Sequence, residues 1–172
     1  MRYWDRLSTL SRLSILCSTL LIGGNTGLAE EAVGKLRNFK PTEQAEKELQ
    51  RAKEIASALD IRPLNEPHCM APSACHLFAP DFGSVGFTIP SDGTVRVSGI
   101  SEATGEVEAT ICTWVVALLT EIEDLGAARA IASGLIDEVR ATKETVTITE
   151  FGADLIGEWR FDKYVKCRGV RP

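Results

Sequence analysis

The chain lacks any hydrophobic run long enough to cross a bilayer. Its first apolar stretch, residues 13–24, is much shorter than the about 20 residues that a transmembrane helix needs. A second apolar run, ICTWVVALL at residues 111–119, has glutamates within a few residues on both sides. The sequence therefore predicts no permanent membrane anchor.

Several motifs of common enzyme classes are also absent. Gly83, Gly86 and Gly93 lie in or beside a predicted hairpin, without the strand-to-helix turn that phosphate-binding loops need. No Cys-x-x-Cys pair supports a thioredoxin-like redox enzyme, and there is no internal repeat or low-complexity segment. The two histidines leave few imidazoles for catalysis or metal binding. We expect no cofactor.

The N-terminus has the pattern of a cleaved secretory signal peptide. MRYWDRLSTLSR is basic, residues 13–24 are apolar, and Gly27-Leu28-Ala29 places small residues at the first and third positions before Glu30. A buried N-terminal helix is the alternative, but no polar face accompanies its leucines. We expect residues 1–29 to be removed and residues 30–172 to be exported, to a periplasm or the extracellular space.

The charge balance is acidic. Taking three Arg and one Asp of the leader from 19 Lys and Arg and 24 Asp and Glu leaves a mature net charge of −7. Nucleic acids and anionic membranes bind clustered cations, so both are disfavoured as partners. The densest basic tract, KYVKCRGVR at residues 163–171, is explained by one strand with a charged outer face. The expected partner is another protein.

The first part of the mature chain predicts a helix, a loop and a hairpin. Residues 42–60 have Thr42 as N-cap and a thin, alanine-rich apolar stripe at helical spacing. Residues 61–83 contain four prolines and are expected to be a Pro-rich Cys/His loop. Residues 84–89 and 94–100 alternate like paired strands around the turn PSDG.

The second part predicts two helices followed by two strands. Residues 106–123 place Ile111, Trp114 and Leu118 on one helical face, and Asp124 is a candidate cap for the next helix. TVTITEF and EWRFDKYVKC, which contains Phe161, alternate like strands. The order predicts a single α+β domain over residues 30–172, with a helical segment at 30–60 and a core at 84–172. In it, a small antiparallel sheet of two hairpins packs against two to three helices.

The stretch HCMAPSACH, residues 68–76, has two interpretations. One is a disulfide between Cys69 and Cys75, which leaves Cys112 to pair with Cys167, because four cysteines in an exported domain favour two disulfides. The other is a metal site, since thiolate, imidazole and thioether together suit Cu(I) or Zn²⁺. Its ligands would be His68, Cys69, Met70, Cys75 and His76. The export signal favours the disulfides and no bound metal.

Catalytic candidates are few. The carboxylate clusters near the predicted helix ends could perform acid–base chemistry, but such clusters are mostly caps and solvated faces. They comprise Glu106, Glu108, Glu121, Glu123 and Asp124. The sequence favours an exported, non-catalytic binding module, such as an inhibitor, chaperone, assembly factor or immunity-type partner. The alternative is a small envelope enzyme or metal-binding protein that uses the His68-Cys69 and Cys75-His76 pairs.

Overall fold

The structure is a computed structural model that describes residues 37–101 and 103–172. These residues belong to one compact unit, Lys35–Pro172. The predicted signal peptide and its cleavage site after Ala29 lie outside the described residues. Among the helices of this unit, none is long and apolar enough to cross a membrane.

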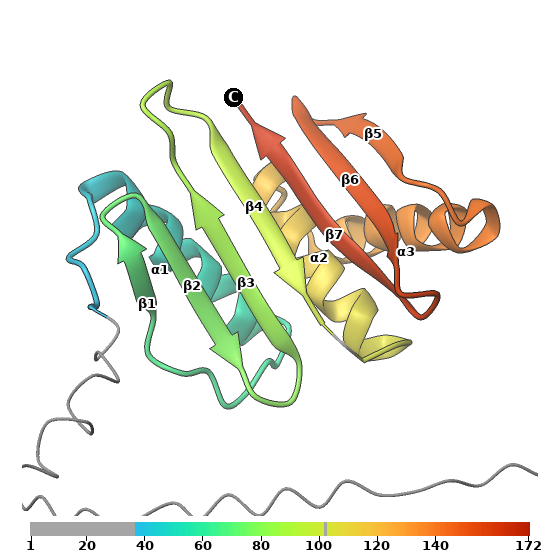
Figure 1. The fold of residues 1–172 in the computed structure, drawn as a ribbon, viewed down its shortest axis with the longest axis horizontal. Helices are drawn as coiled ribbons and strands as arrows, with labels where there is room; N and C mark the ends of the chain where they lie inside the picture. Colours follow the sequence, from blue (N-terminus) through green and yellow to red (C-terminus); the bar gives the residue numbers. More distant parts are fainter. Residues whose placement is uncertain (1–36, 102) are drawn as a thin grey trace, which may run out of the picture. The chain divides into compact units, whose positions relative to one another are not determined.

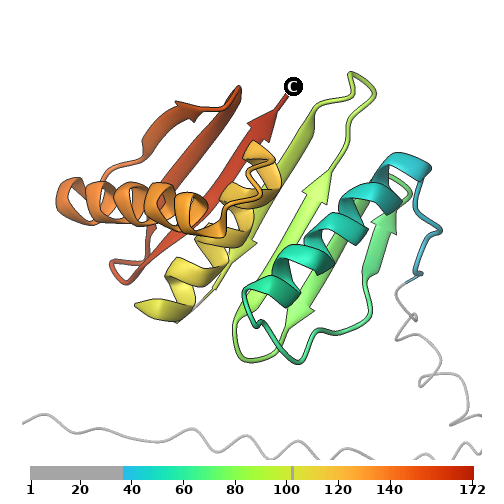
Figure 2. The same ribbon diagram turned by 180° about the vertical axis from the view of Figure 1, so that it is seen from behind.

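Seven strands form one antiparallel sheet, and three helices pack on one of its faces (Figures 1 and 2). The strand order is β1-β2-β3-β4-β7-β6-β5, so β4 and the last strand meet at its centre. The elements are α1 (Glu43–Ala58), β1 (His68–Ala71), β2 (Ala74–Ala79), β3 (Gly83–Thr88), β4 (Val95–Ile100), α2 (Glu106–Thr120), α3 (Leu125–Thr142), β5 (Val146–Glu150), β6 (Ala153–Arg160) and β7 (Tyr164–Arg171). The predicted α+β class with an antiparallel sheet is confirmed.

The helices α1 and α3 begin at the predicted caps. The Thr42 hydroxyl accepts a hydrogen bond from the Ala45 amide at 3.2 Å, and Asp124 accepts from the amides of Gly126 and Ala127. Such caps satisfy amides that have no partner within the helix. Each helix then buries one stripe of residues, and three of the six buried residues of α1 are alanines, at the helical spacing that the sequence predicted.

The middle helix, α2, is buried on nearly all sides, from Thr110 to Thr120. The helix approaches the sheet closely at glycines of the strands. A Cβ on Gly99 of β4 would lie 2.7 Å from side-chain atoms of Ile111 and Val115 of α2. A disulfide between Cys112 and Cys167, with a Cα–Cα distance of 5.3 Å, joins α2 to β7. This is the pairing that the sequence favoured, and it fixes the central helix to the centre of the sheet.

Two predicted segments differ from the structure. Residues 61–83 were expected to be irregular, but they contain β1 and β2, because the prolines at 63, 67, 72 and 80 all lie outside the paired residues. EWRFDKYVKC was expected to be one strand with Phe161 in the core. Instead a turn separates β6 from β7, Phe161 and Asp162 have left-handed backbone conformations, and Phe161 is 86% exposed.

Candidate functional site

The β1–β2 hairpin holds both histidines and the first disulfide. Cys69 and Cys75 face each other across the hairpin and are bonded, with a Cα–Cα distance of 3.9 Å. Both are buried toward the helices, because the Cys69–Cys75 pair lies on the core side of the strands. His68 and His76 are the adjacent cross-strand pair, so they lie on the opposite face.

The hairpin does not bring together the full metal-ligand set proposed from the sequence. The disulfide occupies both sulfurs. The His76 ring lies against Gly86 of β3, where a Cβ would overlap Nδ1, and therefore leans away from His68 on β1. Burial lowers the pKa of His76 below its ordinary value, and the charge of the nearby His68 lowers it further. Within residues 37–101 and 103–172, no group of three or more His, Cys, Asp or Glu side chains could hold a metal ion.

We call the face of the sheet opposite the three helices the uncovered face. One row of neighbouring residues crosses it from β1 to β5. In order, the row contains His68, His76, Gly86, Ser98, Arg168, Ile156 and Thr147. Glycine and serine at its centre leave space between larger neighbours, and a hollow of about 330 Å³ lies there, lined by residues of β2, β3, β4, β6 and β7.

The hollow is lined by cationic and hydroxyl groups. Arg96, Lys166 and Arg168 contribute positive charge, and His76 and Ser98 lie between them in the central row. The Ser98 hydroxyl oxygen is buried without a hydrogen-bond partner. A buried polar atom without a partner is unusual and calls for an explanation.

One carboxylate lies beside the hollow and orients Arg168. Glu158 Oε1 is 2.6 Å from Arg168 Nε, and its other oxygen pairs with Arg160. Burial opposes ionisation of Glu158, but the hydrogen bond from Arg160 and the charges of Arg168 and Arg160 outweigh burial, so the pKa of Glu158 is lowered. Glu158 is therefore an anion that holds Arg168 in place.

Exposed apolar side chains adjoin the hollow on the same face. Phe78, Ser84 and Ile100 are consecutive cross-strand neighbours on β2, β3 and β4, and Phe78 and Ile100 are 47% and 45% exposed. Ile156 and Val170 continue the apolar lining of the hollow on β6 and β7. A surface with apolar and cationic groups side by side is typical of an interaction site rather than of a purely solvated face.

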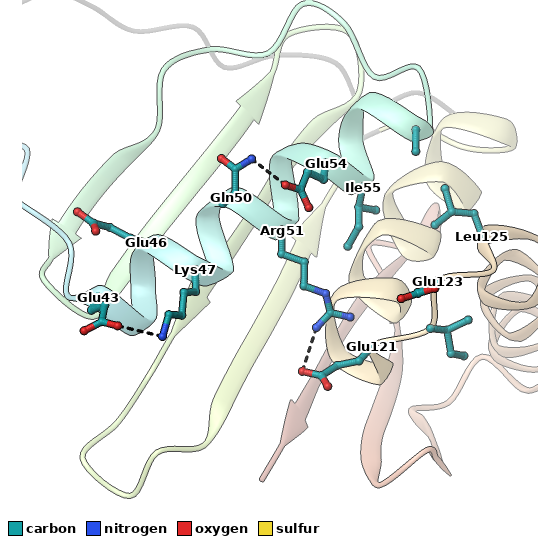
Figure 3. A pocket seen from close by; sticks show the side chains of 12 residues that line it. Glu43, Glu46, Lys47, Gln50, Arg51, Glu54, Ile55, Glu121, Glu123 and Leu125 are labelled. Carbon is teal, nitrogen blue, oxygen red and sulfur yellow. Dashed lines mark hydrogen bonds and ion pairs between the residues drawn. The ribbon is translucent and has the colours of Figure 1, made fainter.

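A larger cleft of about 950 Å³ lies on the helix side, between α1 and the α2–α3 connection (Figure 3). Its polar groups pair mainly with one another, as Figure 3 shows for Arg51 with Glu121 at 3.0 Å and Lys47 with Glu43 at 3.0 Å. Arg51 also donates to the Ala117 carbonyl, and Arg171 donates to the Leu118 carbonyl. These carbonyls end α2 and have no partner within the helix, so both arginines stabilise its C-terminus.

Three of the five carboxylates considered for catalysis have structural contacts. Glu108 is buried, pairs with Arg140 and accepts from the Val165 amide. Glu121 pairs with both Arg51 and Arg171, and Asp124 caps α3. Glu106 and Glu123 are exposed, and no described contact brings them to an imidazole.

The sequence interpretation identified His76 but missed Ser98, Arg96 and Arg168. The alternation in TVRVSGI and KYVKCRGVR places each of them on an outward face, but the pairing of β4 with β7 that brings them together is not visible in either segment alone. Comparison with protein-family models, curated proteins and solved structures finds no match to this chain at the significance level applied.

Proposed function

We propose that the protein is an exported, disulfide-bonded module that binds another protein and catalyses no reaction. Its binding surface is the uncovered face of the sheet. The observation that carries this proposal is the combination, on that face, of exposed Phe78 and Ile100 with the cations Arg96, Lys166 and Arg168. Charge complementarity requires an acidic partner surface, and the apolar residues supply contact area.

Export is supported by two observations. The leader has the order of a signal peptide, and both disulfides are compatible with an oxidising compartment. The function classes that remain are those in which a small, rigid domain acts through one face. An inhibitor, a chaperone, an assembly factor and an immunity-type partner all belong to them.

The proposal is tested by capturing partners from the envelope or secreted fraction of the native host with three forms of the protein. Phe78→Ser with Ile100→Ser removes two exposed apolar side chains from the face. Phe151→Ser with Phe161→Ser is the matched control, because both aromatic residues are exposed at hairpin turns outside the hollow. We expect an acidic protein that the wild type and the control retain and the first variant loses.

Circular dichroism and thermal unfolding must show that the Phe78→Ser, Ile100→Ser variant is folded. A partner that both double variants retain equally would contradict the uncovered face as the binding surface. A substrate turned over by the purified protein, and lost with His76→Ala, would instead favour the envelope-enzyme alternative.

A further inference from the structure

We infer that the hollow on the uncovered face binds a carboxylate group of the protein partner, with Arg96, Arg168 and Ser98 as hydrogen-bond donors. The inference rests on the proposed function, because it names the group that this face recognises. It is argued from an excess of donors, from the buried Ser98 hydroxyl and from the size of the hollow.

The hollow contains more donors than acceptors. In the described part of the chain, no hydrogen bond or ion pair involves the side chains of Arg96 or Lys166, and Arg168 uses only Nε on Glu158. The terminal nitrogens of Arg168 therefore retain donors that point to no described acceptor. The backbone acceptors of the surrounding strands are largely used within the sheet. An acceptor-rich group is what this lining lacks.

Ser98 gives the hollow a fixed centre. Its hydroxyl oxygen is buried and unpartnered, whereas an exposed serine would exchange hydrogen bonds with water. Arg168 is its cross-strand neighbour on β7, and Arg96 lies two residues before it on the same face of β4. One carboxylate oxygen can accept from Ser98, and both oxygens can accept from a guanidinium group in the bidentate manner that arginine favours.

The size of the hollow and the charge of the chain favour a protein carboxylate over an extended polyanion. A volume of about 330 Å³ accepts one or two side chains, and the whole chain has a net charge of −5. Nucleic acids and anionic membranes are bound by larger cationic surfaces than this hollow, and their extended negative charge would be repelled by an acidic chain. Phe78 and Ile100 beside the hollow supply the apolar contacts of a protein interface.

The inference is tested by nuclear magnetic resonance titration of the folded mature chain with the peptide acetyl-pentaglutamate amide. The backbone amides of Gly86 and Ser98 report on the hollow, and acetyl-pentaglutamine amide is the uncharged control peptide. We expect saturable shifts with the glutamate peptide only. Arg96→Gln should weaken binding at least about tenfold, because it removes a charge-assisted donor. Arg129→Gln, which removes an exposed cation of α3, should change the affinity less than about twofold.

Four results would overturn the inference. They are equal binding of both peptides, equal weakening by Arg96→Gln and Arg129→Gln, tighter binding of inorganic phosphate than of the glutamate peptide, and saturation of the same amides by phosphatidylglycerol vesicles alone. The test is separate from that of the proposed function. If partner capture still depends on Phe78 and Ile100 but the peptide does not bind, the uncovered face is still supported as the binding surface, and the carboxylate site is contradicted.

Discussion

At the scale of single residues, Glu108 is a carboxylate that the fold holds almost entirely out of water. It is 1% exposed, accepts a hydrogen bond from the Val165 amide at the start of β7, and pairs with Arg140 of α3. The Arg140 side chain is 37% exposed, so the main loss on removing Glu108 is the buried Val165 amide left without an acceptor, which costs about 1–3 kcal/mol. We expect Glu108→Ala to lower the free energy of unfolding by this amount in a urea titration. Glu106→Ala, at an exposed position of the same helix turn, should change it by less than about 0.5 kcal/mol.

A change at Ser98 should affect stability and binding in opposite directions. Its buried hydroxyl has no partner, and an unsatisfied buried polar group costs about 1–3 kcal/mol. We therefore expect Ser98→Ala to raise the free energy of unfolding by about 1 kcal/mol while it weakens binding of the glutamate peptide. A residue that serves only the fold would not separate the two effects. A loss of stability above about 0.5 kcal/mol would mean that the hydroxyl already has a partner.

At the scale of elements, the two disulfides constrain very different lengths of chain. Cys69–Cys75 closes a loop with a sequence separation of 6, and Cys112–Cys167 one of 55. In the chain-entropy model these bridges contribute about 2 and about 4 kcal/mol. We expect Cys112→Ala with Cys167→Ala to lower the unfolding temperature more than Cys69→Ala with Cys75→Ala. Hydrogen exchange should also show that the Cys69→Ala, Cys75→Ala variant loses protection mainly in β1. Equal losses from both variants would contradict the loop-length argument.

Elements with local signals were predictable from the sequence, and elements that depend on distant partners were not. Thr42 and Asp124 cap their helices with hydrogen bonds to residues two or three positions away, so the signal is complete within a few residues. The turn between β6 and β7 uses Phe161 and Asp162 at positive φ, without the glycine that would mark it. Apart from Lys163, which breaks the row and suggests an edge strand or a strand end, the apolar alternation from Trp159 and Phe161 to Val165 and Cys167 continues through this turn by coincidence. The sequence interpretation therefore placed Phe161 in the core.

The candidate site was predictable only in part, for the same reason. Outward positions for Arg96, Ser98 and Arg168 follow from alternation within each strand. Their convergence follows from the pairing of β4 with β7, which are separated by both helices and two strands. The histidine pair was visible because both members lie within one short hairpin.

At the scale of the whole molecule, the export prediction concerns residues outside the described structure. We expect protein recovered from the native host to begin at Glu30, as measured by intact mass, and to contain no free thiol when denatured without reductant. Removal of the leader also removes Cys17, and the remaining four cysteines are those bonded in the structure. A mature chain that still carries Met1, or that has two reactive thiols, would contradict the prediction.

The position of β7 at the centre of the sheet has a consequence for the order of folding. Translation and secretion both deliver a chain from its N-terminus, but β1 to β4 cannot join β5 and β6 until Tyr164–Arg171 has emerged. The same strand contains Cys167, which bonds to Cys112, and the Val165 amide, which donates to Glu108. It also contains Arg171, which donates to a carbonyl at the C-terminus of α2. Such non-local pairing makes folding slow relative to that of proteins with local contacts. We therefore expect the sheet to remain incomplete until its last strand arrives, and to close in a single late step.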